Sequence, residues 1–171
     1  MRNKLNCICI IPARGGSKRI PNKNIKLFLG KPIILHVIEV LQKSKLFKKI
    51  IISSDSRKIL NITKKSKCET HIRKKSLSDD YATTIEVIKN VIKDYQDKIN
   101  FDKVLCVYPT SVFLKKKHLS IALNKLKKTN NFIFSAKSFN HPIQRSFYKS
   151  KSNKIFMVNK KYSKTRTQDL R

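Results

Sequence analysis

A basic loop that contains two glycines follows the first apolar run of the chain. Residues 11–24 have the sequence IPARGGSKRIPNKN, in which Gly15 and Gly16 stand side by side in a chain with only three glycines. Glycine lets a backbone approach a ligand closely, and successive backbone N–H groups can form a concave anion site. With the guanidinium of Arg14 and the ammonium of Lys23 nearby, these residue types predict a loop that binds a polyphosphate.

The spacing of the glycines differs from that of two common phosphate-binding motifs. The chain has neither the GxxxxGK[ST] pattern of the Walker A loop nor the GxGxxG pattern of dinucleotide-binding folds at this place. A tight turn with solvent-exposed lysines is the alternative that the residues alone leave open.

Short apolar runs alternate with amphipathic stretches along the chain. Apolar, β-branched runs predict buried strands, whereas apolar residues at helical spacing predict helices. The alternation predicts an α/β fold in one domain over residues 1–171, a three-layer, doubly wound, Rossmann-like sheet of mostly parallel strands. Strands are expected at residues 7–13, 48–55, 68–73, 102–111 and 131–137, and helices at residues 32–46, 57–66, 82–95 and 116–128.

The loops that follow the strands are where we expect a ligand. In doubly wound sheets, ligands bind beyond the carboxyl ends of the strands. The basic loop is the first of these loops, so its position and its residue types indicate the same site. The loops comprise residues 12–24, 53–56, 73–84, 108–114 and 138–145.

The net charge of the chain is extreme. The 40 Lys and Arg residues outnumber the 10 Asp and Glu residues and give a charge of +30. This indicates either anionic partners or an AT-rich coding composition, because Lys, Asn and Ile are abundant throughout. A basic nucleic-acid-binding protein is the competing class of function. Since the cations are spread over every segment and no binding motif is present, we expect no specific nucleic-acid partner.

The cysteines and the hydropathy give no sign of export or of a membrane span. The four cysteines lack the spacing of zinc ligands, and Cys7 and Cys9 alternate within an apolar run as core residues do. No stretch reaches the roughly 18 apolar residues that a membrane span needs. We therefore expect a cytoplasmic protein that does not enter a membrane.

Several segments resemble one family. IPARGGSKRIPNKNIKLFLGKPII closely resembles the opening of the acylneuraminate cytidylyltransferases, the CMP-sialic acid synthetase family. The likeness covers essentially the whole chain, since it continues in IIISSDSRKI, RKKSLSDDYATT, YPTSVFL, PIQR and TRTQDL. Within the family, SLSDDYATT, Tyr108 before Pro-Thr-Ser, HPIQR and TRTQDL are most similar to the pseudaminic acid branch. The resemblance implies the nucleotide-diphospho-sugar transferase version of the fold.

The resemblance implies a reaction and its partners. CTP and a nine-carbon α-keto acid sugar, with pseudaminic acid as the first choice, would give the CMP-sugar and pyrophosphate, with Mg²⁺ as cofactor. A homodimer is possible. The alternatives are a CMP-N-acetylneuraminate or legionaminate synthetase, a different sugar nucleotidyltransferase, and a family member that binds CTP without turnover.

The resemblance also implies roles for individual residues. Arg14 and Lys23 would act in catalysis, by neutralising charge on the phosphates. The residues expected to bind the nucleotide are Arg14, Gly15, Gly16, Ser17, Lys23, Asn24, Arg73, Asp80, Ala82, Thr83 and Thr84. The residues expected to bind the sugar are Tyr108, Thr110, Ser111, Gln144, Arg145 and Arg166.

Structural roles compete with some of these functional ones. Asp79, Asp80 and Thr83 are also good caps for the helix that follows them. Asp55 or Ser56 can cap the helix expected at residues 57–66, and for Asp55 helix capping is the first expectation and a ligand-facing role the second. Arg145 could equally be a surface charge, as could Arg166.

The chain departs from the family at its end. Family members run on for several dozen residues beyond the point that corresponds to Arg171, so we expect this chain to lack the family's C-terminal segment and leave its activity at this length open. That segment normally supplies aspartates for Mg²⁺. Asp55, Asp80 and Asp169 are the only plausible donors here and none has a partner at ligand spacing, so the metal ligands are unknown.

Overall fold

The computed structural model describes residues 6–129 and 131–170 and divides into two compact units, Met1–Asn131 and Phe132–Arg171. Each unit is described by itself. The single domain expected over residues 1–171 stays a prediction.

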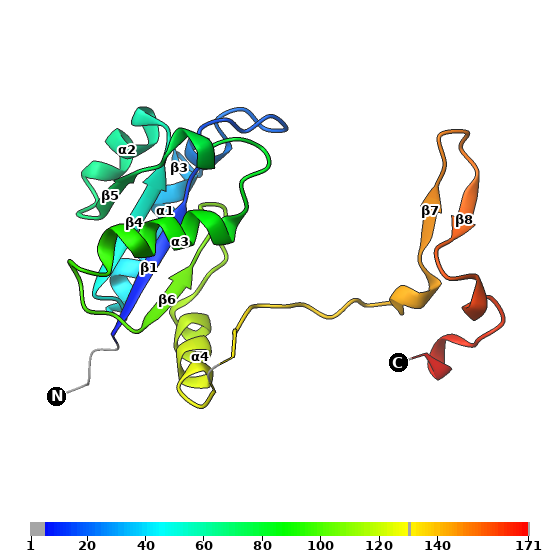
Figure 1. Ribbon diagram of the computed structural model, residues 1–171. Helices are drawn as coiled ribbons and strands as arrows, with labels where there is room; N and C mark the ends of the chain where they lie inside the picture. The colour runs from blue at the N-terminus through cyan, green and yellow to red at the C-terminus, as the bar shows by residue number, and fades with distance from the viewer. Residues whose placement is uncertain (1–5, 130, 171) are drawn as a thin grey trace. The chain divides into compact units, whose positions relative to one another are not determined.

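Four parallel strands form the central sheet of the first unit (Figure 1). They are β1 (Cys7–Pro12), β4 (Lys49–Ser54), β5 (Glu69–Ile72) and β6 (Lys103–Cys106), in the order β5-β4-β1-β6. Ile10 of β1 is paired with Ile51 on one side and with Cys106 on the other. The α/β class and the parallel sheet expected from the sequence are confirmed.

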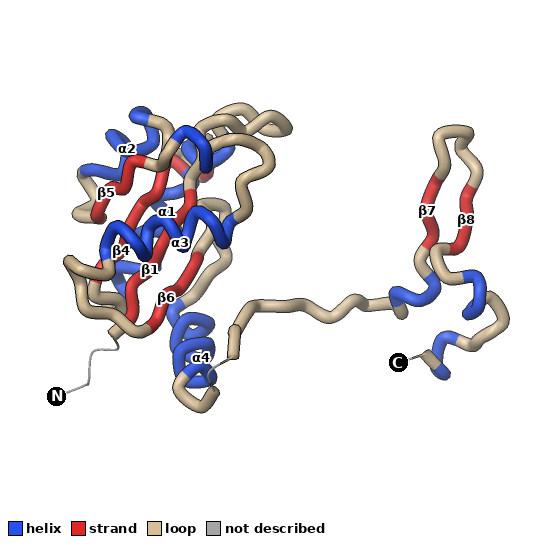
Figure 2. Tube along the Cα trace, in the orientation of Figure 1, coloured by secondary structure: helices blue, strands red, loops and turns tan. Residues whose placement is uncertain are grey.

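Four helices alternate with these strands (Figure 2). They are α1 (Ile33–Ser44), α2 (Arg57–Lys64), α3 (Thr84–Tyr95) and α4 (Lys116–Leu126). Helical spacing places Ile34, Val37 and Leu41 on the buried stripe of α1. Ser56, not Asp55, is the N-cap of α2, because its side chain accepts a hydrogen bond from Ile59 N, and the capping role expected for Asp55 is therefore wrong.

The alternation of side chains along β1 builds the three layers. Cys7, Cys9 and Ile11 point into a core that includes apolar residues of α1, α2 and α4. Ile8 and Ile10 point the other way and pack with residues of α3. Successive side chains of a strand face opposite sides of the sheet, so a strand that is apolar throughout must be covered on both faces.

The two cysteines of β1 are core residues, as expected. Cys7 and Cys9 are fully buried. Burial raises the pKa of the Cys7 thiol to about 11, so the thiolate is scarce at neutral pH. These cysteines behave as small apolar side chains.

The strand order places the site. Along the chain, β1, β4 and β5 are added to the sheet in one direction. The connection through α3 then leads to β6, on the other side of β1. Because crossovers between parallel strands are right-handed, this reversal puts α3 on the face opposite α1. The loops after β1 and β6 therefore diverge at the carboxyl end of the sheet, where doubly wound folds bind ligands.

Replacing Ile10 by alanine is expected to lower the free energy of unfolding by about 2–5 kcal/mol, because it leaves a cavity in a packed core. Ile10 is fully buried in the middle of the sheet. Urea unfolding followed by circular dichroism measures the change. Ile121→Ala is the matched control, since the Ile121 side chain is 54% exposed on α4 and should change little.

Short elements complete the first unit. β2 (Leu27–Phe28) and β3 (Lys31–Pro32) form a hairpin, and 3₁₀ turns occur at Lys23–Ile25 and Lys75–Leu77. Leu29 and Gly30, the two turn residues of the hairpin, both have positive φ, as a tight hairpin turn requires.

The second unit contains a two-stranded hairpin. Its strands are β7 (Phe147–Lys149) and β8 (Ile155–Met157), with Tyr148 stacked on Phe156 at 5.5 Å between ring centroids. Short 3₁₀ helices lie at Ile143–Arg145, Lys160–Tyr162 and Thr167–Asp169.

The strand expected at residues 131–137 is wrong. The described residues from 131 to 142 adopt neither helix nor strand, and the Phe132 and Phe134 side chains are 96% and 82% exposed. Alternating apolar residues favour a strand only where another strand can accept their backbone hydrogen bonds.

Within residues 6–129 and 131–170, no helix has the length and apolar character that crossing a membrane requires.

Candidate active site

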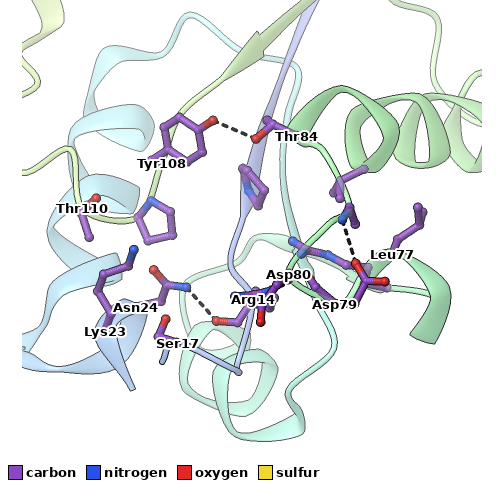
Figure 3. Close-up of a pocket in the computed structure, with 15 residues that line it drawn as sticks. Arg14, Ser17, Lys23, Asn24, Leu77, Asp79, Asp80, Thr84, Tyr108 and Thr110 are labelled. Carbon is purple, nitrogen blue, oxygen red and sulfur yellow. Dashed lines mark hydrogen bonds and ion pairs between the residues drawn. The ribbon is translucent and has the colours of Figure 1, made fainter. Parts of the chain in front are cut away.

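A pocket of about 200 Å³ opens at the carboxyl end of the sheet, among the loops after β1, β5 and β6 and the start of α3 (Figure 3). Its walls are mainly polar, with Leu77 and Val87 as apolar patches. The lining residues are Pro12, Arg14, Ser17, Lys23, Asn24, Arg73, Leu77, Asp79, Asp80, Ala82, Thr84, Val87, Tyr108, Pro109 and Thr110.

Arg14 lies in the pocket and is held by the loop before α3. Its Nη2 donates to Asp80 Oδ1 at 2.6 Å, and its Nη1 donates to the carbonyl oxygen of Asp79. Lys18 pairs with the second oxygen of Asp80. Hydrogen bonds from Lys18 and Arg14 hold the pKa of the Asp80 carboxyl below its usual value. The carboxylate therefore occupies the donors that a phosphate would use.

Gly15 brings the basic loop against the start of α2. Its N–H donates to Asp55 Oδ1 at 2.9 Å. A Cβ at Gly15 would lie 2.9 Å from the Cβ of Ser56, whereas a Cβ at Gly16 would meet nothing within 4 Å. Neither glycine has positive φ. Close approach is thus the reason for glycine at position 15, and no feature of the described structure explains Gly16.

Asn24 and Lys23 form the opposite side of the basic loop. The Asn24 side chain is buried and its Nδ2 donates to the carbonyl oxygen of Arg14 at 2.8 Å. Lys23 is exposed and lines the pocket. Among the described residues, no carboxylate lies within ion-pair distance of the Lys23 ammonium. Lys23 is therefore a cation available to an anionic ligand.

The backbone N–H groups just before α3 form hydrogen bonds to side chains of the same segment. Asp79 Oδ1 accepts hydrogen bonds from the backbone N–H groups of Tyr81 and Ala82, at 3.0 and 2.7 Å. Thr83 forms a capping box with Glu86, and the hydrogen bonds from the N–H and hydroxyl of Thr83 lower the pKa of Glu86. The capping role expected for Thr83 is confirmed. The same role expected for Asp79 and Asp80 is wrong, because Asp79 accepts from residues that precede the N-cap and Asp80 makes the ion pairs described above.

Arg73 enters the pocket from the end of β5 and is only 7% exposed. Its Nη2 donates to the carbonyl oxygen of Ser53 at 2.8 Å, and its Nε lies 3.5 Å from Ser53 Oγ. Burial lowers the pKa of Arg73. A guanidinium nevertheless stays protonated at neutral pH. The Arg73 side chain is a fixed cation in the wall of the pocket.

Tyr108 closes the side of the pocket next to β6. Its hydroxyl and Thr84 Oγ1 are 2.8 Å apart, which joins the loop after β6 to the start of α3, as Figure 3 shows. Thr110 also lines the pocket.

The structure brings most of the expected nucleotide residues together. Arg14, Ser17, Lys23, Asn24, Arg73, Asp80, Ala82 and Thr84 line the pocket, as do Tyr108 and Thr110 from the expected sugar set. Gly15, Gly16, Thr83 and Ser111 are described but are not lining residues. Their expected roles in ligand binding stay predictions.

Sequence reasoning missed five lining residues: Pro12, Leu77, Asp79, Val87 and Pro109. The sequence gives an indication for two of them. Asp79 is a residue type that caps turns, as it does before α3, and Val87 is an apolar residue on the buried side of the first turn of α3.

The remaining expected sugar residues belong to the second unit. Arg145 Nη1 donates to Thr167 Oγ1 at 3.0 Å, and Arg166 forms a two-bond ion pair with Asp169, with Nε–Oδ2 at 2.8 Å. Gln144 is engaged in an interaction of its own. The roles of Gln144, Arg145 and Arg166 in binding a sugar stay predictions.

The pocket does not fit a metal ion held by side chains alone. Across the described part of the chain, there is no group of three His, Cys, Asp or Glu side chains that could hold a metal. Asp80, the pocket carboxylate with oxygens directed at the basic loop, already pairs with two cations.

Comparison with protein families gives a match over nearly the whole chain. Residues 8–169 match the family described as cytidylyltransferase.

Proteins of similar sequence include enzymes of this kind. The chain is 43% identical over 166 residues to a pseudaminic acid cytidylyltransferase of Campylobacter jejuni. The aligned region covers 95% of the chain and 72% of that protein. It is 37% identical over 118 residues to an N-acylneuraminate cytidylyltransferase of Streptococcus agalactiae. Here the aligned region covers 68% of the chain and 28% of that protein.

Solved structures of similar fold include CMP:2-keto-3-deoxy-manno-octonic acid synthetase in complex with CTP, with a TM-score of 0.60 and 17% identity over 72% of the chain. A cytidylyltransferase of Leptospira borgpetersenii has a TM-score of 0.58 and 21% identity over 71% of the chain. The chain spans about half the length of each, 48% in both cases. At these identities the likeness shows the fold alone.

Proposed function

We propose that this chain, which belongs to the cytidylyltransferase family, transfers the cytidylyl group of CTP to a sialic-acid-like sugar. One observation carries the proposal: Arg14, Lys23 and Arg73 converge on a single pocket at the carboxyl end of the sheet. Three cations from two loops suit the phosphates of a nucleoside triphosphate.

The proposed reaction is a substitution at phosphorus. The anomeric hydroxyl oxygen of the sugar forms a bond to the α-phosphorus of CTP, and the bond from that phosphorus to the bridging oxygen of the β-phosphate breaks. Pyrophosphate leaves with the electron pair, and the hydroxyl proton passes to solvent. Such transfers depend on positioning and on charge neutralisation more than on covalent chemistry by the protein.

Arg14 and Lys23 are the residues that we propose for charge neutralisation. Arg14 can exchange its present partner Asp80 for a phosphate oxygen, because both are anionic acceptors. Lys23 has an ammonium group free for the same purpose. Ser17 and the backbone of Gly15 and Gly16 would complete the phosphate site.

We propose that the nucleoside lies between the start of α3 and Arg73. Ala82 and Thr84 line this part of the pocket together with Leu77 and Val87. Apolar side chains cover the faces of a base, while backbone and short polar groups can bond to its edge.

Pseudaminic acid is the sugar that we propose first. The support is the 43% identity to the enzyme of Campylobacter jejuni. Tyr108, Thr110 and Ser111 of the first unit would border the sugar. The expectation that Arg145 or Arg166 of the second unit binds the sugar carboxylate through paired hydrogen bonds stays a prediction, as does the role of Gln144.

Mg²⁺, a homodimer and a cytoplasmic location stay predictions for this chain. Because the described side chains do not form a metal cage, the proposed mechanism has no step that a metal performs.

Pyrophosphate release tests the proposal directly. In the presence of Mg²⁺, the purified 171-residue chain is expected to release pyrophosphate from CTP only when pseudaminic acid is present. Parallel reactions contain N-acetylneuraminic acid, no sugar, or UTP and ATP in place of CTP. A chelator in a further reaction measures the need for Mg²⁺.

Thermal stabilisation by CTP on the same sample separates binding from turnover. Stabilisation without pyrophosphate release would support a chain that binds CTP without turnover. The absence of both stabilisation and pyrophosphate release would contradict the proposed function.

A further inference from the structure

A row of polar side chains leads from the pocket to the far end of α3. Arg73 Nε lies 3.5 Å from Ser53 Oγ, which lies 3.1 Å from His71 Nδ1. His71 Nε2 lies 2.9 Å from Asp94 Oδ2. Asp94 stands ten residues after Thr84, which corresponds to about 15 Å along a helix. The row therefore joins the C-terminal end of α3 to Arg73 in one wall of the pocket.

The sheet register assembles this row. Ser53 of β4 is the register partner of Pro12 in β1 and of His71 in β5. Pro12 lines the pocket. Ser53 and His71 are 0% and 6% exposed. These polar groups are thus fixed by strand pairing and shielded from water, and a buried polar group without a partner is costly.

The partners determine which atoms donate. Asp94 has a pKa lowered by its hydrogen bond from His71, so it is a carboxylate that only accepts, and His71 Nε2 must donate to it. In the neutral imidazole, Nδ1 then accepts from the hydroxyl of Ser53. The oxygen of that hydroxyl keeps a lone pair directed at Arg73 Nε–H. Each member of the row thereby orients the next.

Arg73 needs such support because it is a buried cation that no described carboxylate contacts directly, although the charge of Asp55 acts on it from a longer distance. None of the ion pairs found among the described residues includes Arg73. Within the described residues, its side chain donates hydrogen bonds to Ser53 O, at 2.8 Å, and to Ser53 Oγ. The position of the guanidinium in the pocket thus depends on one serine.

We infer that Ser53, His71 and Asp94 are positioning residues that hold the Arg73 guanidinium in place for CTP. The inference rests on the proposed function, since it assigns a role to the same pocket. The three residues touch no ligand themselves and act through Arg73. A buried histidine that merely satisfies its own hydrogen bonds is the alternative, and it predicts a loss of stability with unchanged affinity for CTP.

Asp94→Ala and Ser53→Ala test the inference. Each is expected to raise the Kd and the KM for CTP about tenfold, because each removes one orienting hydrogen bond from a charged group. The kcat at saturating CTP should stay within about twofold, since Arg73 contributes to binding in ground and transition states alike. Asp94→Asn should restore the affinity, because the amide oxygen of asparagine can still accept from His71 Nε2.

Ser44→Ala is the matched control for the loss of a buried hydroxyl. Ser44 is 2% exposed in the last turn of α1, and its Oγ donates to the Leu41 carbonyl oxygen at 2.6 Å. No lining residue of the pocket belongs to α1. Ser44→Ala should lower the melting temperature without changing the affinity for CTP. Asp94 has a side chain 39% exposed, so Asp94→Ala is expected to fold even if Ser53→Ala does not.

The outcomes separate this inference from the proposed function. If the wild-type protein binds CTP and the Asp94→Ala variant binds it equally well, the inference is overturned while the proposed function stands. Equal loss of affinity in Asp94→Asn and Asp94→Ala would also overturn it, since only charge would then matter. Wild-type protein that does not bind CTP would overturn both.

Discussion

Lys23→Ala and Arg14→Ala should each abolish measurable turnover, with a fall in kcat of about 100- to 1,000-fold. Both side chains line the pocket. Lys23 has no carboxylate partner among the described residues, and Arg14 has partners that a phosphate can replace. Steady-state pyrophosphate release with CTP and pseudaminic acid measures the effect.

The fold should survive both changes, because neither side chain belongs to the buried core. Circular dichroism and the melting temperature check this. Lys26→Ala is the matched control: Lys26 is exposed, lies three residues from Lys23, and is not a lining residue of the pocket. Rates equal to wild type in both Lys23→Ala and Arg14→Ala would refute the phosphate-loop assignment.

The fold was largely predictable because its signals are local. Apolar runs of β-branched residues identify β1 and β4 without knowledge of their neighbours. The alternation with helices then leaves few topologies, since crossovers are right-handed. The expected strand at residues 131–137 failed because a strand also needs a partner edge, which no local pattern supplies.

The basic loop was predictable in part. Its residue types indicated anion binding, and the structure places Arg14, Ser17, Lys23 and Asn24 in one pocket. The need for Gly15 was not predictable, because it arises from Ser56, the N-cap of α2, some forty positions away. The pairing of Arg14 with Asp80 depends in the same way on two loops that only the folded sheet brings together.

The row from Arg73 to Asp94 had no signal in the sequence. Ser53, His71 and Asp94 come from two strands and a helix, and each type is common in structural roles. His71 alone indicates only a histidine near a strand. The contact that distinguishes it depends on register, and register is a property of the assembled sheet.

Gly15→Ala should lower turnover by about 100-fold, although it adds only one methyl group. The new Cβ would lie 2.9 Å from the Cβ of Ser56, closer than carbon atoms normally approach. The loop must then move away from α2, which breaks the hydrogen bond from Gly15 N to Asp55 and displaces Arg14 from the pocket. The backbone itself tolerates alanine, because Gly15 does not have positive φ.

Two variants make this prediction specific to the contact with Ser56. Gly16→Ala is the comparison, since a Cβ there meets nothing within 4 Å. It should leave the loop against α2 in place, so any loss of rate in this variant would report on the approach of the Gly16 backbone to the phosphates. The double variant Gly15→Ala/Ser56→Gly removes the clashing Cβ, and glycine in place of serine at an N-cap costs only a few tenths of a kcal/mol. It should therefore recover most of the lost rate. A double variant as slow as Gly15→Ala would mean that glycine is required there for contact with the nucleotide, not for the approach of the loop to α2.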